Sequence, residues 1–320
     1  MNRSPVQFAP CTISVVVPVY NSEGSLRDLA QELARVLPTF SQNYELILVN
    51  DGSRDKSWEV VCELTQTYPW AHGINLMRNY GQHNALLCGI RAAQYDVVIT
   101  MDDDLQHPPD EIHTLLDKLA EGYDVVYGTP QELPHSLWRN IMSLVTKRAM
   151  ASAMGIGAIR DISAFRVFRT NVRNAFVNYQ SPNLLLDVLL SWGTTRFASV
   201  KVSHEPRRIG RSNYTFLRLF NQAMLVLTGF STGPLRAASL VGFASTLFGL
   251  GVLAYVIGRY WIEGGSVPGF PFLASVIAIF SGAQLFAVGI IGEYLGRMFN
   301  RSMERPTYVI AEQSQPSCEK

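Results

Sequence analysis

Short apolar runs and helical segments alternate along the first part of the chain. Runs rich in β-branched residues and bounded by Pro, Gly, Asn or Asp are typical of buried strands. Five such runs predict strands: Thr12–Val17, Tyr44–Val49, His72–Leu76, Asp96–Thr100 and Tyr123–Tyr127. Apolar residues at helical spacing, or a helix-start signal, predict helices at Gly24–Leu37, after Asp55, at Gln82–Gln94 and at Asp110–Ala120. This alternation implies βαβ units and therefore an α/β fold with a mostly parallel sheet.

The pattern changes after Gly128, where two basic amphipathic helices are predicted. They span Leu137–Met154 and Asn213–Leu227, and both carry aromatic residues. Helices of this composition bind the membrane interface in many proteins, but the same pattern also describes ordinary surface helices. The second helix directly precedes a long apolar block, which favours the interfacial interpretation for it.

Two apolar blocks near the carboxyl end reach membrane-spanning length. Leu240–Tyr260 and Phe270–Ile291 each contain the roughly 20 apolar residues that a span needs. The Gly- and Pro-rich segment Glu263–Gly269 between them is too short for a domain, so we expect a helical hairpin. Arginines flank this hairpin on both sides: Arg236, Arg297, Arg301 and Arg305. Because basic residues gather on the cytoplasmic side of membrane helices, we expect a multi-pass protein with both termini in the cytoplasm.

These patterns divide the 320 residues into four segments: a cytoplasmic α/β domain over 1–212, an interfacial amphipathic helix over 213–233, a transmembrane hairpin over 234–299 and a cytoplasmic tail over 300–320. The net charge of +1 argues against nucleic acid as a partner. The four cysteines include no C-x-x-C pair, which argues against a zinc site or disulfide framework and fits a reducing compartment. No basic and then apolar segment opens the chain, so no secretory signal is expected.

Three adjacent carboxylates, Asp102, Asp103 and Asp104, directly follow the fourth predicted strand. The carboxyl ends of strands are where open α/β sheets bind ligands. Adjacent carboxylates repel one another, and a hard divalent cation such as Mg²⁺ would relieve that repulsion. In a strand extension, alternate residues share a side, so Asp102 and Asp104 would converge while Asp103 points elsewhere. The alternative is a solvated acidic turn.

Motifs after three of the predicted strands carry a family resemblance. They are P-V-Y-N at Pro18–Asn21, N-D-G-S-R-D at Asn50–Asp55 and D-D-D-L-Q at Asp102–Gln106. Together they resemble the inverting family 2 glycosyltransferases of GT-A fold, and more narrowly the polyisoprenyl-phosphate glycosyltransferases, such as the dolichol-phosphate mannosyltransferases and bactoprenol glucosyltransferases. R-N-Y-G-Q-H at Arg78–His83 and G-E-Y-L-G-R at Gly292–Arg297 are similar to the undecaprenyl-phosphate 4-deoxy-4-formamido-L-arabinose transferases of that group. The resemblance runs from about Ile13 to Tyr308.

The resemblance implies a nucleotide pocket. In the family, the aspartate of D-G-S and the P-x-Y loop hold the nucleotide, which implies Asp51 at the base or ribose, with Pro18 and Tyr20 as pocket walls. Arg78 is a further substrate-binding candidate from the R-N-Y-G motif. The alternative for Asp51 is a turn-forming residue. The family's Glu directly after P-x-Y-N is displaced here by one position to Glu23, which weakens a nucleotide contact from it.

The resemblance also implies a metal site. The family's D-x-D and the following Gln bind Mg²⁺ or Mn²⁺ on the donor diphosphate. These roles carry over to Asp102, Asp104 and Gln106 as metal ligands, with Asp102 and Asp104 as catalytic residues. Asp103 is carried over as a substrate-binding residue.

The segment at 161–169 resembles the family's F-R-x-x-R region near the acceptor. In some members an aspartate just before F-R is proposed as the base, but here Ala164 takes that place and Asp161 is the nearest carboxylate. A phosphate monoester has its second pKa near 6, so the oxygen of a polyprenyl phosphate is largely deprotonated at pH 7 and has little need of a base. The catalytic candidates are therefore Asp161, as a weak substitute for that base, and Arg166, as an arginine that holds phosphate.

Arginines suit the task of holding two anions close together, because the guanidinium binds phosphate through two hydrogen bonds. Arg169 follows from the F-R-x-x-R segment, and Arg207 and Arg211 from R-R-I-G-R-S-N-Y, in which Asn213 replaces the family's Lys. Each of these arginines has the alternative of a structural ion pair.

The expected activity is transfer of a sugar, from a UDP-linked donor, to undecaprenyl phosphate at the cytoplasmic face of the bacterial inner membrane, within cell-envelope or lipopolysaccharide biosynthesis. The resemblance implies the membrane, the nucleotide sugar and the lipid as partners, and a homo-oligomer, since tetramers occur in the family. One rival is a family 2 enzyme with a saccharide acceptor, although the Q-x-x-R-W of processive enzymes is absent. Another is a catalytically silent scaffold, against which the intact D-x-D argues. A G-x-S-x-G pattern at Gly229–Gly233 joins a helix to a span, so it is not a hydrolase elbow.

Overall fold

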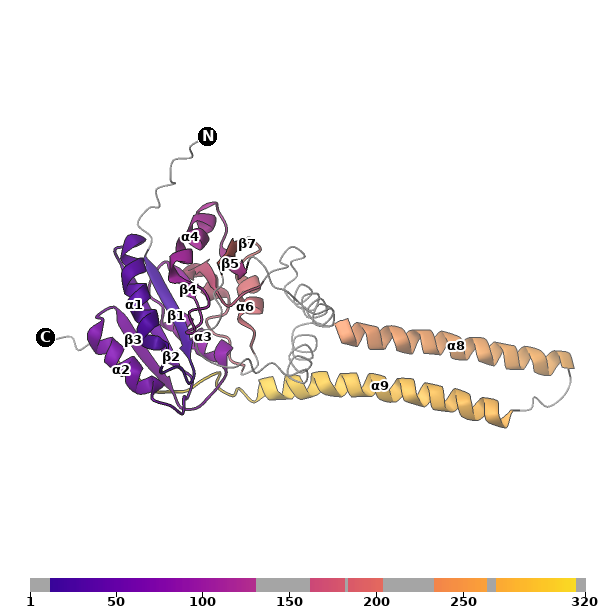
Figure 1. Ribbon diagram of the computed structural model, residues 1–320. Coiled ribbons are helices and arrows are strands. Elements are labelled where there is room, and N and C mark those ends of the chain that lie inside the picture. Colours follow the sequence, from indigo (N-terminus) through magenta and orange to yellow (C-terminus); the bar gives the residue numbers. More distant parts are fainter. Residues whose placement is uncertain (1–11, 131–161, 182–183, 204–232, 264–268, 315–320) are drawn as a thin grey trace, which may run out of the picture. The chain divides into compact units, whose positions relative to one another are not determined.

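The computed structural model describes residues 12–130, 162–181, 184–203, 233–263 and 269–314. The chain forms two compact units: residues 1–215 together with 304–320, and residues 216–303. The first unit contains the sheet and the second contains two long helices (Figure 1). Both predicted amphipathic helices, at 137–154 and 213–227, lie outside the described residues.

The described part of the first unit is built on one eight-stranded, mostly parallel sheet. Its strands are β1 (Ile13–Val19), β2 (Tyr44–Asn50), β3 (Ala71–Leu76), β4 (Val97–Thr100), β5 (Val125–Pro130), β6 (Arg166–Arg169), β7 (Phe197–Val202) and β8 (Ile310–Ser314). They lie in the order β7-β5-β6-β4-β1-β2-β3-β8. Only β6 and β8 run antiparallel to their neighbours. The predicted α/β fold with a mostly parallel sheet is confirmed.

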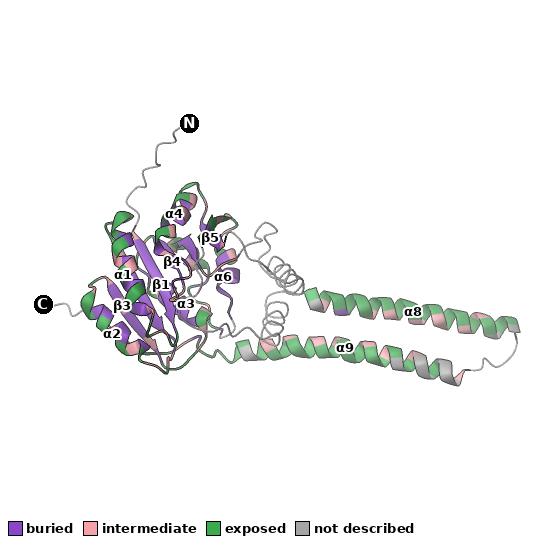
Figure 2. Ribbon diagram, in the orientation of Figure 1, coloured by how far each residue is buried: buried purple, intermediate pink, exposed green. Residues whose placement is uncertain are grey.

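Helices cover both faces of the sheet because the strands are apolar on both sides. On β1, Ile13, Val15 and Val17 pack with α1, α2 and α4, whereas Val16 packs with α3 and α6. The helices are α1 (Leu26–Val36), α2 (Ser57–Thr67), α3 (Gln82–Ala92), α4 (Ile112–Ala120) and α6 (Leu186–Gly193), with short 3₁₀ turns η1 (Leu37–Thr39), η2 (Pro109–Glu111) and η3 (Thr170–Ala175). Figure 2 shows buried residues along the strands and on the inner helix faces. Such runs with no polar alternation mark strands buried on both faces.

The five predicted strands form within two or three residues of their predicted ends, but β1 continues through Pro18 to Val19. Pairing with β2 persists to the end, where Val19 lies opposite Asn50. A proline near a strand end removes a single N–H and does not stop its neighbours from pairing.

Three strands were not predicted, and each has a physical reason. β6 has only four residues, and β7 is half exposed along most of its length. The sequence of β8, I-A-E-Q-S, is largely polar and exposed, so it forms through main-chain pairing with the edge of β3 rather than through apolar burial. The segment expected as a cytoplasmic tail over 300–320 therefore contributes one of the two edge strands of the sheet.

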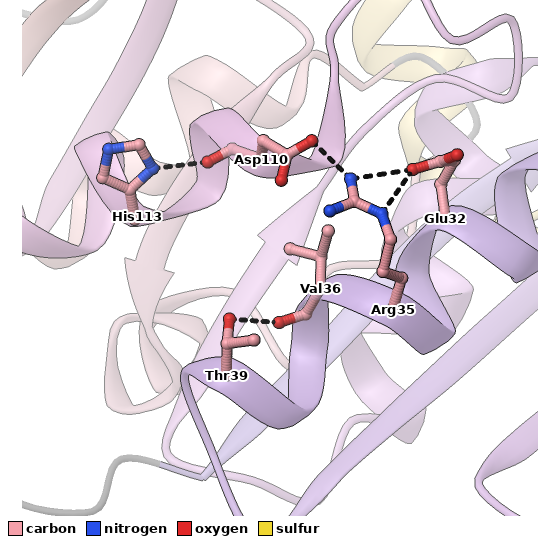
Figure 3. A network of polar contacts seen from close by, with 6 residues as sticks. All are labelled: Glu32, Arg35, Val36, Thr39, Asp110 and His113. Carbon is pink, nitrogen blue, oxygen red and sulfur yellow. Dashed lines mark hydrogen bonds and ion pairs between the residues drawn. The ribbon is translucent and has the colours of Figure 1, made fainter.

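Polar contacts fasten the segment after β4 to α1 (Figure 3). Arg35 donates to Glu32 on its own helix at 2.9 Å and to Asp110 in η2 at 2.5 Å. The Asp110 carbonyl in turn accepts a hydrogen bond from the ring of His113. Because all these charged groups are exposed, the contacts orient the two elements more than they stabilise them.

The second unit contains α8 (Gly233–Glu263) and α9 (Phe270–Ser302), which pack side by side (Figure 1). Leu235–Arg259 and Ile279–Phe299, of 25 and 21 residues, are long and apolar enough to cross a membrane. Helix α9 contains both this second stretch and the predicted span over 270–291, and its Glu293 and Arg297 pair with each other at 2.7 Å. At Gly249 a Cβ would lie 2.6 Å from the ring of Phe280, so the glycine permits close packing of the two helices.

Candidate active site

Most of the predicted site residues that the structure describes lie where four neighbouring strands end. β4, β1, β2 and β3 are mutually parallel, so their carboxyl ends lie at one edge of the sheet. The loops that follow them contain Tyr20, Asp51, Arg78 and Asp102. Ligands bind in open α/β sheets at this kind of edge.

The loop after β1 is fastened to the loop after β2. The Asn21 N–H donates to the Ser53 hydroxyl at 3.0 Å, and the Asn21 side-chain oxygen accepts the Arg54 N–H at 2.8 Å. Asn21 has a left-handed φ of 55°, which asparagine tolerates better than most residues. Tyr20 is 45% exposed and therefore available to a ligand, whereas Pro18 is buried within β1.

Glu23 forms hydrogen bonds with the residues just before α2. Its carboxylate accepts the Lys56 N–H at 3.0 Å, while its own N–H donates to Asp55 at 3.3 Å. Asp55 also accepts the N–H of Ser57, the first residue of α2, at 3.1 Å. The shifted glutamate thus joins the β1 loop to the start of α2.

The carboxylate of Asp51 binds main chain from the loop after β3. Its two oxygens accept the N–H groups of Tyr80 and Gly81 at 2.7 and 2.8 Å, and the residue is only 3% exposed. Burial raises the pKa of Asp51, while these two hydrogen bonds act in the opposite direction. These contacts are with a distant loop and not with the turn that contains Asp51, so Asp51 joins the loops after β2 and β3, and its contact with a nucleotide stays a prediction.

Gly52 allows the two loops to touch. A Cβ at this position would lie 2.5 Å from the carbonyl carbon of Arg78 and 2.6 Å from the nitrogen of Asn79. Its φ of 65° is also in the region that favours glycine. The loops after β2 and β3 are therefore in direct backbone contact.

The loop after β3 presents a cation and a polar side chain. The guanidinium of the exposed Arg78 lies 4.6 Å from the centre of the Tyr80 ring, a cation–π distance. Gly81, with a φ of 96°, then leads into α3. The first residue of that helix, Gln82, donates from Nε2 to Oδ1 of Asp102 at 2.7 Å.

The three carboxylates lie beyond the end of β4, and the strand ends at Thr100. Asp103 and Asp104 form a turn, so strand alternation does not set their directions as expected. Asp103 instead accepts a hydrogen bond from the Tyr20 N–H and lies beside the Ser22 hydroxyl, which donates to the Tyr20 carbonyl at 3.1 Å. Burial raises its pKa to about 6, and the neighbouring charge of Asp104 acts in the same direction.

The end of this turn is strained. Oδ1 of Asp104 accepts the Gln106 N–H at 3.1 Å. Between them, Leu105 has a φ of 56° while its side chain is buried in the core. A non-glycine residue in this conformation persists only where its surroundings hold it, and such residues concentrate at functional sites.

The donor set suits a hard divalent cation completed by a ligand. Among the residues that the structure describes, no three His, Cys, Asp or Glu side chains gather into a metal cluster. Mg²⁺ bound with phosphates takes only one or two carboxylates from the protein, with phosphate oxygens and water as further ligands. Asp102 and Asp104, with the amide oxygen of Gln106, provide oxygen atoms of this type.

The two arginines of β6 lie at opposite ends of that strand. Because β6 is antiparallel to β4, Arg166 lies opposite Thr100 at the site edge, and Arg169 lies opposite Val97. Three residues of strand separate them by about 10 Å. Arg169 is also 3.8 Å from Asp124. The structure therefore places Arg169 at the end of β6 away from the carboxylate turn, and its binding of substrate phosphate stays a prediction.

Arg166 is at the site edge but is buried in an ion pair with Asp187 of α6. Tyr127 donates its hydroxyl to the same carboxylate at 3.0 Å. Three further candidates, Asp161, Arg207 and Arg211, lie outside the described residues.

Residues 14–172 match the family described as Glycosyl transferase family 2. The undecaprenyl-phosphate 4-deoxy-4-formamido-L-arabinose transferase of Shewanella sediminis (strain HAW-EB3) is 34% identical over 308 residues, covering 94% of this chain and 92% of that protein. The protein of the same name from Pseudomonas aeruginosa (strain LESB58) is 35% identical over 306 residues, covering 93% and 89%. The chain belongs to glycosyl transferase family 2.

Solved structures with similar folds include glucosyl-3-phosphoglycerate synthase from Mycobacterium tuberculosis in complex with Mn²⁺, UDP and phosphoglyceric acid. That chain is 19% identical, with a TM-score of 0.51 and coverage of 68% of this chain and 76% of that one. In a complex of the same enzyme with Mn²⁺, UDP and glucosyl-3-phosphoglycerate, the chain is 19% identical, with a TM-score of 0.51. The match covers 71% of this chain and 84% of that one. This family 2 chain has the GT-A fold, as predicted.

Two residues at this family 2 site were missed by the sequence analysis. Gln82 lies within the R-N-Y-G-Q-H motif, and its place directly after a glycine at a helix start was the available signal. Asp187 is the one carboxylate in the apolar helix L-D-V-L-L-S-W-G, and a buried charge of this kind requires a partner. Neither partner is close in sequence, so neither contact was predicted.

Proposed function

We propose that this protein is an inverting glycosyltransferase that moves a sugar from a UDP-linked donor to undecaprenyl phosphate. The observation that carries the proposal is the identity of about 35% over nearly the whole chain, including the hairpin, to relatives named undecaprenyl-phosphate 4-deoxy-4-formamido-L-arabinose transferases. The carboxylate turn at the sheet edge supports it, because it offers oxygen ligands where the fold binds its substrates.

At the donor side, Asp102, Asp104 and Gln106 would hold Mg²⁺ or Mn²⁺. When bound, the ion neutralises the charge that develops on the leaving diphosphate. The exposed ring of Tyr20 forms one wall for the nucleotide, and Arg78 attracts the diphosphate from the opposite loop. Asp103 holds the Tyr20 loop in place through its contacts with Ser22 and the Tyr20 N–H.

At the acceptor side, the lipid phosphate is itself the nucleophile. Its oxygen is largely deprotonated at pH 7, so direct attack on the anomeric carbon is possible where Ala164 replaces a carboxylate. A single displacement of this kind inverts the anomeric configuration. The charge of Arg166 is balanced by Asp187, so we assign Arg166 the role of orienting neighbouring groups more than that of adding positive charge to the site. We assign the acceptor phosphate to Arg207 and Arg211 and any residual base function to Asp161.

The lipid acceptor explains the second unit. The chain leaves the sheet unit before α8 and returns to it for β8 after α9. A pair of spans brings the chain back to the side from which it started, so the sheet unit and β8 belong on one face of the membrane. The flanking arginines, Arg236 and Arg301, favour the cytoplasmic face of the bacterial inner membrane.

The test is incubation of the purified protein with undecaprenyl phosphate and a panel of UDP-sugars, including the 4-formamido-arabinose donor, with lipid products identified by mass spectrometry. We expect one donor to give a glycosylated undecaprenyl phosphate. Parallel reactions offer the same donors with free saccharides as acceptors. Sugar transfer to a saccharide alone would contradict the lipid assignment, and UDP binding without any transfer would favour a silent scaffold.

A further inference from the structure

We infer that Gln82 is a positioning residue for the metal ligand Asp102, and that Asp51 supports Gln82 through the loop that precedes it. The inference rests on the proposed function, because only there is Asp102 a metal ligand. Its central observation is the 2.7 Å hydrogen bond from Gln82 Nε2 to Asp102 Oδ1, which joins the start of α3 to the turn after β4.

The position of Gln82 depends on the loop before it. Asp51 holds the N–H groups of the two preceding residues, Tyr80 and Gly81, with one carboxylate oxygen each. Two consecutive N–H groups held by one carboxylate fix the direction in which the chain enters α3. The Asn84 side chain closes the same turn by donating to the Tyr80 carbonyl at 2.7 Å.

The loop after β3 is also in close backbone contact with the loop after β2. The backbone of Gly52 touches that of Arg78 and Asn79, so the loop after β3 has no room to move towards β2. Gly81 enters the helix with a φ of 96°, a conformation that other residues rarely adopt. The backbone of Gln82 is therefore held in one position, from which its side chain reaches Asp102.

A glutamine is chemically suited to this role. Its amide N–H restricts the orientation of the Asp102 carboxylate without adding a positive charge, whereas a lysine or arginine would compete with a cation. Groups that hydrogen-bond a metal-binding carboxylate orient it, and losing such a partner costs roughly 10- to 100-fold in metal affinity. Asp51 does not touch Gln82 itself but holds the two residues before it, and at 3% exposure it is buried between the two loops.

The experiment uses the full chain in detergent and four proteins: wild type, Gln82→Ala, Asp51→Asn and the double variant. Mn²⁺ affinity is measured by electron paramagnetic resonance with saturating UDP, and UDP affinity is measured separately without metal. Gln66→Ala is the matched control, since Gln66 is an exposed glutamine on the surface of α2. Melting temperatures are recorded for all variants.

We expect Gln82→Ala to weaken Mn²⁺ binding about 10- to 100-fold while UDP affinity without metal and the melting temperature stay at control values. Asp51→Asn replaces one acceptor oxygen by an N–H group that repels a backbone N–H, so it should weaken Mn²⁺ binding too. The double variant should be no weaker than the weaker single variant. Wild-type Mn²⁺ affinity in Gln82→Ala would overturn the inference, whatever Asp51→Asn does to folding.

Wild-type Mn²⁺ affinity in Asp51→Asn, with a normal melting temperature, would overturn the supporting role of Asp51. Failure of the proposed metal site has a different signature: the wild type itself would bind no Mn²⁺ in the presence of UDP. The two failures are therefore distinguished by the wild-type measurement.

Discussion

Arg166 forms an ion pair with Asp187 inside the protein, and the two residues are only 2% and 4% exposed. The same carboxylate accepts the Tyr127 hydroxyl at 3.0 Å, and the Arg166 guanidinium lies 5.8 Å from the centre of the Tyr127 ring. Burial raises the pKa of Tyr127, and the charge of Asp187 raises it further. The arginine of the F-R motif is thus held at the site edge by a buried polar cluster.

Removing Asp187 should be strongly destabilising. Asp187→Ala leaves Arg166 buried without its anion, which costs about 3–5 kcal/mol when one partner of a buried ion pair is removed. We expect a lowered melting temperature. Asp117→Ala is the control, because Asp117 is exposed on α4. Equal melting temperatures for the two variants would contradict a structural role for the pair.

Asp104 should be required for turnover and not for folding. Asp104→Ala removes a proposed metal ligand, and metal charge stabilisation is worth several kcal/mol, so we expect a rate loss of at least about a hundredfold. Excess chelator should abolish transfer by the wild type, and Mn²⁺ or Mg²⁺ should restore it. A normal melting temperature separates this result from misfolding. Undiminished glycolipid formation in chelator would show that the metal assignment is wrong.

Gly52 should tolerate no side chain. Gly52→Ala places a Cβ within 2.5 Å of the Arg78 backbone, which neither loop can accommodate. The matched control is Gly122→Ala, at a φ of 103° with nothing within 4 Å of the added Cβ. Both variants carry backbone strain of roughly 1 kcal/mol or more, but only Gly52→Ala forces the loops apart. We expect it to have the lower melting temperature and weaker UDP binding, and similar values for both variants would contradict the contact.

His83 should make the protein less stable in acid. Burial lowers the pKa of His83 below its usual 6.5, although the charge of Asp187 acts in the opposite direction. The unfolded chain therefore takes up the proton first, so stability present above pH 6.5 is lost as the pH falls below that value. Melting temperatures between pH 5 and 8 test this, with His83→Asn expected to flatten the low-pH part of the curve. An unchanged slope in that variant would assign the effect to another group.

Much of the framework could be read from local sequence. β1 to β5 follow from short apolar runs, and the turn at Asp102–Gln106 follows from carboxylates placed directly after one of them. The two long apolar helices are equally local, since length and composition alone indicate them. These features depend on residues that are close together in the sequence, so the pattern of apolar and polar residues along the chain is enough to predict them.

Contacts between distant residues were decided only by the tertiary structure. The bonds from Asp51 to Tyr80 and from Gln82 to Asp102 join residues 29 and 20 positions apart. β8 forms from a largely polar segment because the edge of β3 offers it main-chain partners. Residues close together in the chain therefore predict β1 to β5 and the motifs that follow them. The antiparallel pairing of β6, which separates Arg166 from Arg169, and the contact between the loops after β2 and β3 exist only in the folded chain, because a strand's own pattern selects the face that it buries and not the distant segment with which it pairs.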